Sequence, residues 1–408
     1  MTDRCRVCDA PISAFMSFGQ QPIANGFHSP DEKGDEYFYE LAPAFCDSCG
    51  TLQIIDQPPA EAMFHDQYAF FTRTSRRMVA HFGEYAAWVA ENFVSGADPF
   101  VVEIGSNDGA MLENFAKTGT RHLGIEPSDN TAAEARRHGV ETLCAFLNPE
   151  TAKNVVETHG NADAVIAANV ICHIPDVQAV AQAIDILLKE DGVFVFEEPY
   201  LGDMIENTSY DQLYDEHVFI FSLRSVASWF KPFGMELIDA LPQGTHGGSM
   251  RYVIGRAGAR TVSPRVAELT AHETALGLDK PETFDAFRAA CEKSRDDLVK
   301  LLRDLNAEGK RVVGYGATSK STTVMNYCGI GPDDIAFISD TTPIKQGKLT
   351  PGTNIPVRPY ADFAADYPDY AVLFAWNHKA EIFANETDYV AAGGQWITFV
   401  PRVEVITE

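Results

Sequence analysis

The sequence predicts an α/β protein in which a small cysteine-containing module precedes two domains of alternating strands and helices. Two observations support this fold class. A pair of Cys-x-x-Cys motifs lies near the N-terminus, and two segments that each read as apolar strand, glycine turn and helix begin near residues 100 and 312. We therefore expect a module over residues 1–60, a central domain with a helical lead-in over 61–258, and a C-terminal domain over 259–408.

The composition limits the classes of partner. The chain has 408 residues, 45% of them hydrophobic, which is typical of a globular protein with several domains. Its formal charge of -26 argues against nucleic acid as a partner, because phosphate backbones require a basic face. No apolar run approaches the roughly 18 residues of a membrane span. The first residues, MTDRCRVCDAP, hold no apolar signal core. We expect a cytoplasmic protein, and the composition indicates no oligomeric state.

Four cysteines in the first 50 residues form two Cys-x-x-Cys pairs: Cys5, Cys8, Cys46 and Cys49. Four thiolates suit tetrahedral zinc with no open position, so the spacing favours structural Zn²⁺. A redox motif does not explain a duplicated pair, and disulfides do not suit a cytosolic chain, but both remain alternatives. The other cysteines are expected to be small core residues: Cys144, Cys172, Cys291 and Cys328.

The lead-in, residues 61–98, is predicted to be helical because apolar residues recur at helical spacing, at Met78, Phe82, Tyr85, Ala86 and Val89. Tyr68 precedes this pattern and adjoins two phenylalanines. A tyrosine in that context is more often a core residue than a site residue.

The central domain begins with FVVEIGSNDGAMLENFA, which reads as a buried strand, a glycine turn and a helix. The spacing Glu103-x-Gly105-x-x-x-Gly109 differs from the G-x-G-x-x-G of dinucleotide sites. The glycines let the backbone approach a ligand, and Asn107 with its neighbour Asp108 is expected to cap the helix. The second strand, in HLGIEPSDN, ends near an acidic residue, Glu126, a position that commonly takes ribose hydroxyls.

Further strands are predicted in ADAVIAANV and GVFVF, followed by a pair, MELIDALPQ and SMRYVIGR, joined by the turn GTHGG. This alternation predicts a doubly wound parallel sheet with right-handed crossovers. The turn VVEIGSNDG, together with Glu126 and ANVICHIPD, resembles the class I S-adenosylmethionine-dependent methyltransferases. The resemblance implies that the turn lies under the amino acid part of the cofactor and that Glu126 holds its ribose. The implied cofactor-binding residues are Glu103, Gly105, Asn107, Gly109, Glu126 and Asn169.

A titratable stretch, Glu197–Ser222, follows the strand GVFVF. In it Tyr214, Glu216 and His217 adjoin the apolar run VFIF, so they are expected to be half buried at the ligand edge of the sheet. Alone, the stretch also fits an acidic surface loop. Its other carboxylates are expected to be solvated: Asp203, Glu206, Asp211 and Asp215. His173 also falls at a strand end, where a core role and a site role remain equally open.

The C-terminal domain opens with a long amphipathic helix over residues 281–310 and then RVVGYGATSKSTTVMNYCGI, a second strand, glycine turn and helix. Backbone N–H groups, hydroxyls and Lys320 at this helix N-terminus form a predicted anion site. The alternative is ordinary helix capping with a solvated lysine. The strands DIAFISD, YAVLFAW and QWITFVP complete a second Rossmann-like domain.

Over its whole length the chain resembles the sugar C-methyltransferases that act on nucleotide-linked 4-keto deoxysugars. The matching motifs are YDEHVFIFS and GYGATSKSTTVMNYCGI, after the four cysteines and the methyltransferase core. Thr318 and Ser319 differ from the proline and small residue expected there. The resemblance implies a nucleotide-sugar substrate held with help from the C-terminal domain. It implies catalytic residues Tyr68, His173, Tyr214, Glu216 and His217, and substrate-binding residues Gly316, Ser319, Lys320, Ser321 and Asn326.

Carbon methylation explains these residue types. A C–H next to a ketone can be removed to leave a nucleophilic enolate carbon, so the site needs a base and donors to the ketone oxygen. His217 titrates in the right range, and Tyr214 lies three residues away, on the same face if the segment is helical. We expect methylation at C3. One alternative is a small-molecule O- or N-methyltransferase on the same core, which needs no enolising base. A nucleic-acid-binding zinc module is a third hypothesis.

Overall fold

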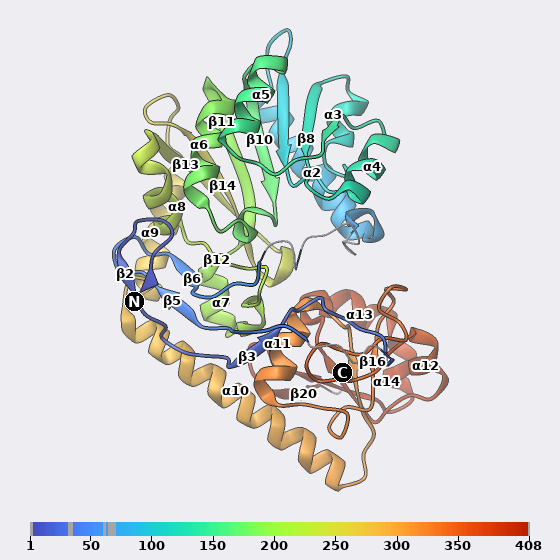
Figure 1. Cartoon of the computed structure of the whole chain (residues 1–408). Coiled ribbons are helices and arrows are strands. Elements are labelled where there is room, and N and C mark those ends of the chain that lie inside the picture. The colour runs from blue at the N-terminus through green and yellow to red at the C-terminus, as the bar shows by residue number, and fades with distance from the viewer. Residues whose placement is uncertain (1–2, 32–35, 60–62, 64–70, 407–408) are drawn as a thin grey trace.

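The computed structural model describes residues 3–31, 36–59, 63 and 71–406. Its two large sheets have seven and six strands. Figure 1 shows the seven-stranded sheet in the upper part of the molecule and the six-stranded sheet in the lower part. The N-terminal module lies beside the junction of the two. The α/β class with a cysteine module and two Rossmann-like domains is therefore confirmed.

The central sheet has the order β13-β14-β11-β10-β7-β8-β9. Five strands pair in parallel, as expected for a doubly wound sheet, and the predicted pair joined by the turn GTHGG adds β14 antiparallel to both of its neighbours. The turn between β13 and β14 is residues 244–248, far too short for the crossover that a parallel pair needs. The strands are β7 (Phe100–Ile104), β8 (Arg121–Ile125), β9 (Thr142–Leu143), β10 (Ala162–Ala168), β11 (Leu188–Pro199), β13 (Met235–Gln243) and β14 (Ser249–Arg256).

Helices cover both faces of this sheet (Figure 1). The predicted apolar stripe of α2 (Arg76–Phe93) is buried against Val101, Ile166 and Val195 on one face. The helix α6 (Val177–Leu187) packs on the other face. The remaining helices of the domain are α3 (Glu113–Lys117), α4 (Asp129–Arg137), α5 (Pro149–His159), α7 (Leu201–Asn207) and α8 (Leu223–Phe230). Across the described ranges, no helix combines the length and the apolarity that a membrane crossing requires.

The N-terminal module consists of short antiparallel strands: β1 (Asp3–Arg4), β2 (Pro11–Ile12), β3 (Gln20–Pro22), β4 (Phe38–Glu40), β5 (Pro43–Phe45) and β6 (Leu52–Ile54). Its sheet takes one strand from the central domain, because β12 (Phe219–Ile220) pairs antiparallel with β6. The apolar run VFIF therefore completes the module's sheet. This pairing fixes the chain two residues after His217.

The C-terminal sheet has the order β17-β16-β15-β18-β19-β20, parallel except for β20. Its strands are β15 (Val312–Tyr315), β16 (Ile338–Ser339), β17 (Val357–Arg358), β18 (Tyr370–Leu373), β19 (Gln395–Thr398) and β20 (Glu404–Ile406). The predicted long helix is α10 (Pro281–Ala307), which runs along the side of the molecule in Figure 1. The other helices are α9 (Pro264–Leu276), α11 (Ser319–Cys328), α12 (Tyr360–Ala365), α13 (Lys379–Asn385) and α14 (Thr387–Ala391).

Candidate active site

A cavity of about 230 Å³ lies at the C-terminal ends of β7, β8 and β10. The strand order reverses between β7 and β10, and open α/β sheets bind ligands at such a switch point. The lining includes most of the residues that the sequence suggested for a cofactor: Glu103, Gly105, Asn107, Glu126 and Asn169. His173 and His246 also line it.

The glycine turn after β7 owes its path to left-handed backbone. Gly105 has φ 62° and Gly109 has φ 74°, which non-glycine residues rarely adopt. The expected caps are wrong, because α3 begins only at Glu113 and its N-cap residue makes no side-chain bond. Asn107 Oδ1 instead accepts from the backbone N–H of Thr72 at 3.2 Å, and Asp108 Oδ2 accepts from that of Arg73 at 2.8 Å. These side chains anchor the chain that leads into α2.

The cavity is rich in buried acceptors. Glu126 accepts backbone N–H groups at both oxygens, from Asn107 at 2.9 Å and Ser128 at 2.8 Å, and burial raises the pKa of its carboxyl. Burial also raises the pKa of the Glu103 carboxyl well above its usual range. Within the described residues, Glu103 Oε2 and Asn169 Oδ1 are buried without a hydrogen-bond partner. Such orphaned acceptors fit a cationic, hydroxyl-bearing ligand such as S-adenosylmethionine.

His217 lies in a turn, not a helix, closed by its backbone N–H to the carbonyl of Tyr214 at 3.0 Å. Its Nδ1 is 2.7 Å from the carbonyl oxygen of Gln212. A carbonyl can only accept, so Nδ1 carries the proton and the Nε2 lone pair accepts from the Tyr214 hydroxyl at 2.9 Å. Burial, with His173 and Lys320 nearby, lowers the pKa of His217 well below its usual value. The imidazole therefore stays neutral at neutral pH.

Two further histidines lie around His217. The ring of His173 stacks on that of His217 with centroids 5.4 Å apart, and burial lowers the pKa of His173 to about 4. His246 occupies the β13–β14 turn with φ 53°, and burial lowers its pKa to about 3. Because both also line the cavity, they connect it to His217.

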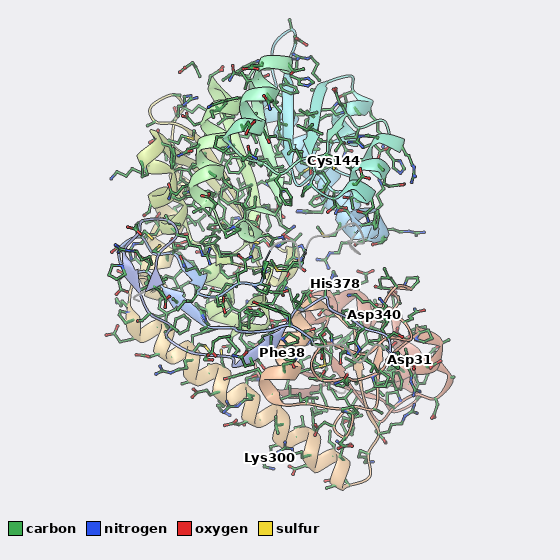
Figure 2. The ribbon with its side chains drawn as sticks, in the orientation of Figure 1. Asp31, Phe38, Cys144, Lys300, Asp340 and His378 are labelled. Atoms are coloured by element: carbon green, nitrogen blue, oxygen red, sulfur yellow. The ribbon has the colours of Figure 1, made fainter. Side chains whose placement is uncertain are left out.

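Lys320 reaches this cluster from the C-terminal domain. Its Nζ donates to the carbonyl oxygen of His246 at 3.0 Å, and burial lowers the pKa of its ammonium to about 8. Lys320 is 9% exposed, so the solvated-lysine alternative is wrong. The buried carboxyl of Asp211 faces Lys320 and accepts from Trp376 Nε1 at 2.7 Å. The neighbouring His378 lies at the edge of this domain nearest the central domain (Figure 2).

Glu216 is tied to the N-terminal module. Its Oε1 accepts from Asn25 Nδ2 at 2.6 Å, and Asn25 Oδ1 accepts from Ser319 Oγ at 3.0 Å. Burial raises the pKa of the Glu216 carboxyl. Three modules therefore meet at this turn. Tyr68 lies outside the described residues.

Two of the carboxylates expected at the surface are fully buried instead. Asp211 and Asp215 are both 0% exposed, so a solvated face was the wrong expectation for them. Asp215 accepts from the backbone N–H of Ala24 at 3.2 Å, and Asp211 from Trp376 as described. Each carboxylate binds the turn to another module, and that module covers the carboxylate.

The suggested substrate-binding residues of α11 are engaged in internal contacts, and their role as substrate contacts stays a prediction. Ser321 Oγ donates to the carbonyl oxygen of Thr318 at 2.6 Å. Asn326 Nδ2 donates to the carbonyl oxygens of Thr322 and Pro351. Gly316 has φ 90°, and a Cβ there would lie 2.8 Å from the Cβ of Ala375.

Two adjacent carboxylates at the end of β11, Glu197 and Glu198, were assigned no role from the sequence. Glu198 Oε1 accepts from three successive backbone N–H groups, of Val170, Ile171 and Cys172, and so holds the turn that carries His173. Glu197 binds His81, Arg251 and the hydroxyl of Thr245, next to His246. Two adjacent glutamates at the end of a buried strand were the sequence signal that could have indicated these roles. For Asn25, His246 and Trp376 the sequence offered no comparable signal.

The four N-terminal cysteines converge. Their Sγ atoms all lie within 4.8 Å of one another, with Cys5–Cys49 and Cys8–Cys46 separations of 3.5 Å. A tetrahedral zinc with sulfur ligands at 2.3 Å places sulfurs about 3.8 Å apart. Four thiols leave no open position, so the set fits structural zinc.

Of the remaining cysteines, Cys172, Cys291 and Cys328 are buried as expected. Cys144 is exposed on the central domain (Figure 2), so its core assignment was wrong. Its Sγ lies 3.5 Å from the carbonyl oxygen of Pro127, in the loop that follows β9.

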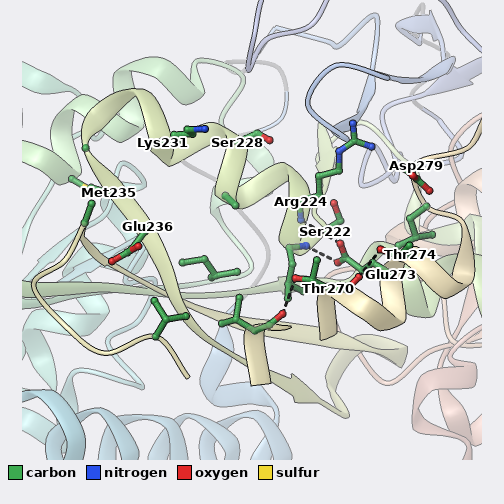
Figure 3. A pocket seen from close by; sticks show the side chains of 18 residues that line it. Ser222, Arg224, Ser228, Lys231, Met235, Glu236, Thr270, Glu273, Thr274 and Asp279 are labelled. Atoms are coloured by element: carbon green, nitrogen blue, oxygen red, sulfur yellow. Dashed lines mark hydrogen bonds between the residues drawn. The ribbon is translucent and has the colours of Figure 1, made fainter. Parts of the chain in front are cut away.

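A second cavity, of about 820 Å³, lies between α8, β13 and α9 (Figure 3). Its buried acid, Glu273, accepts from the backbone N–H groups of Leu223 at 2.6 Å and Arg224 at 3.2 Å. That carboxylate caps α8. Of the suggested catalytic and cofactor-binding residues that the structure describes, none lines this cavity.

Three family models match successive parts of the chain. Residues 5–64 match a zinc binding domain, 78–240 a methyltransferase domain and 244–401 a C-methyltransferase C-terminal domain. The C-methyltransferase NovU of Streptomyces niveus is 34% identical over 99% of this chain and 97% of its own length. A ubiquinone biosynthesis O-methyltransferase of Colwellia psychrerythraea is 24% identical over 35% of this chain and 63% of its own. Magnesium protoporphyrin IX methyltransferase from Synechocystis, solved with SAM, aligns over 44% of this chain and 79% of its own at 14% identity, with a TM-score of 0.33 that supports no inference.

Proposed function

Because this chain belongs to the C-methyltransferase family, we propose that it methylates C3 of a nucleoside-diphosphate-linked 4-keto-deoxysugar. The chain is an S-adenosylmethionine-dependent methyltransferase with a structural zinc site in its N-terminal module. The proposal adds the acceptor carbon, the substrate and the roles of individual residues. The observation that carries it is the buried, neutral imidazole of His217, whose ring stacks on His173 at the wall of the cavity.

In this proposal the cavity at the ends of β7, β8 and β10 holds the cofactor. Glu103 and Asn169, whose buried oxygens line the cavity without a partner among the described residues, would accept from its ammonium, and Glu126 would accept from its ribose hydroxyls. S-adenosylmethionine supplies the methyl group when bound. His173 and His246, at the cavity wall, separate the cofactor side from the sugar side.

The acceptor carbon must first lose a proton. His217 Nε2 takes the proton from C3, and the hydrogen bond from Nδ1 to Gln212 holds the ring in the tautomer that can do so. An imidazolium beside Lys320 is unfavourable until negative charge develops next to it. His217 is therefore protonated only as the negative charge of the enolate forms beside it.

The enolate oxygen needs fixed donors. Lys320 supplies a buried cation near His217. The Tyr214 hydroxyl donates to Nε2 at 2.9 Å before substrate binds, and it turns to the enolate oxygen as a neutral donor when Nε2 takes the C3 proton. Glu216, which binds Asn25 and no nitrogen of His217, is assigned to a sugar hydroxyl or to positioning. Methyl transfer then depends on holding carbon and sulfonium in line.

Solvent exchange tests the proposal. In heavy water, the wild-type protein with a 4-keto nucleotide sugar is expected to introduce deuterium next to the ketone. His217→Ala is expected to slow this exchange about 10²–10⁴-fold, the usual contribution of a general base. Full exchange in His217→Ala would contradict the base assignment.

The O- or N-methyltransferase alternative predicts a different product. Nuclear magnetic resonance of the methylated product separates a carbon-bound methyl from a heteroatom-bound one. Mass spectrometry over a small panel of 4-keto nucleotide sugars identifies the carrier. A heteroatom-bound methyl without any wild-type exchange would overturn the proposed function.

A further inference from the structure

The residue before His173 has no role in the proposed mechanism. Cys172 is fully buried, and its thiol lies beside the carboxylate of Glu198. Its carbonyl accepts from the backbone N–H of Val218 at 2.9 Å, which joins the His173 turn to the His217 turn. This link places a thiol and two imidazoles side by side.

In the part of the chain that the structure describes, two clusters of Cys, His or acidic residues have metal-ligand proximity. One is the four-cysteine set. The other is Cys172, His173 and His217, with one ligand atom from each within 4.8 Å of the others. Zinc bound to sulfur at 2.3 Å and to nitrogen at about 2.0 Å needs ligand separations of about 3.3–3.6 Å. The ligand atoms therefore need to approach one another by at most about 1 Å when the cation binds.

The orientation of His217 suits a metal ligand. Ligating histidines characteristically donate their second ring N–H to a carbonyl or carboxylate, which fixes the other nitrogen as the lone-pair donor. His217 has this arrangement, because Nδ1 donates to the carbonyl oxygen of Gln212 at 2.7 Å. The competing contact at Nε2 is one hydrogen bond from Tyr214, which a metal–nitrogen bond would replace.

We propose that Cys172, His173 and His217 form a second metal site, which takes a thiophilic divalent cation such as Zn²⁺ or Cd²⁺. On binding, the S–H bond of Cys172 breaks, its proton passes to solvent, and the thiolate forms a bond to the cation. The two neutral imidazoles each donate a lone pair and lose no proton. Three protein ligands leave a fourth position open, unlike the closed four-cysteine site.

Occupation of this site switches off the base. A cation on Nε2 of His217 holds the lone pair that takes the C3 proton, so exchange stops while the metal is bound. This consequence rests on the proposed function, but the binding itself does not. A chelator is expected to restore exchange as long as the four-cysteine site keeps its zinc.

Metal content tests the site without any substrate. Full-length protein is incubated with micromolar Zn²⁺, passed through gel filtration and assayed for zinc per chain. Wild type is expected to hold two zinc ions, Cys172→Ser one, and the control Cys291→Ser, which removes a buried thiol of α10, two. Wild type that holds one zinc, or Cys172→Ser that holds two, would overturn the proposal.

A second variant distinguishes the loss of a metal ligand from misfolding of Cys172→Ser. His173→Gln leaves the thiol in place and is also expected to hold one zinc, with the unfolding temperature of each variant recorded. Cadmium titration adds a spectroscopic check, since wild type gains thiolate-to-cadmium absorption that Cys172→Ser lacks. If wild type binds two zinc ions but shows no exchange even after a chelator has emptied the second site, the proposed function fails and the metal site stands. If exchange occurs and one zinc binds, the reverse holds.

Discussion

The two Rossmann-like domains use the same unit, a strand followed by a glycine turn and a helix, for different purposes. After β7 the turn opens on a cavity, and buried acceptors such as Glu103 Oε2 face it without a partner among the described residues. After β15 the turn is filled, because Ala317 donates to Asp340 at 2.7 Å and Thr318 caps α11. Helix α11 instead presents Lys320 to the central domain. A glycine turn therefore signals a ligand only where neighbouring side chains leave its edge open.

The largest expected effect comes from removing the cation of Lys320, which α11 presents to the central domain. Lys320→Met keeps most of the side-chain volume and loses the charge. We expect exchange next to the ketone to slow about 10²–10³-fold, the usual effect of removing one oxyanion donor. The measurement is the exchange rate in heavy water at saturating sugar.

Lys300→Met is the matched control for Lys320→Met, since Lys300 lies on the exposed face of α10 (Figure 2). We expect it to exchange at the wild-type rate. Equal slowing of exchange in both variants would contradict the role of Lys320 in stabilising the enolate.

A smaller effect is expected when the exchange rate is measured as a function of pH. Burial lowers the pKa of Lys320 to about 8, with Asp211 opposing that shift, so the ammonium form declines above pH 8. The pKa of His217 lies well below 6.5, so the base form persists down to acid pH. Exchange should be flat around neutrality, fall at acid pH, and at pH 9 be about tenfold below pH 7.

Lys320→Met should lose the alkaline decline and keep the acid one, because the residue that titrates near pH 8 is absent. A rate that keeps rising above pH 8 in wild type would contradict the role of the ammonium. The rate–pH profiles of the two proteins, measured in the same buffers, decide this.

Much of the fold was predictable because its signals are local. The Glu103–Gly109 spacing, the apolar stripe of α2 and the Cys-x-x-Cys pairs lie within short windows, where turn, helix or metal geometry follows from the residues themselves. The family followed from the same motifs. The antiparallel direction of β14 carries a weaker signal. It follows only from the shortness of the turn GTHGG, which leaves no room for the crossover that a parallel strand needs.

The site was only partly predictable because it is assembled over long sequence distances. Asn25 meets Glu216, and Trp376 meets Asp211, across 191 and 165 residues. Nothing local marks such partners. The same reason explains the errors on Asp211 and Asp215, since an acidic stretch looks solvated until another module covers it. His246 was missed because its role comes from its backbone carbonyl and turn, not from a motif.

The cofactor-binding residues and the base act separately in the proposed mechanism, and the variant Glu126→Gln tests that separation. Two quantities are measured on one preparation: the Kd for S-adenosylmethionine and the rate of deuterium exchange without it. We predict that the Kd rises about 10–100-fold, the value of a hydrogen bond to a charged group, while exchange stays within about twofold of wild type. Exchange that falls in parallel with cofactor affinity would contradict the claim.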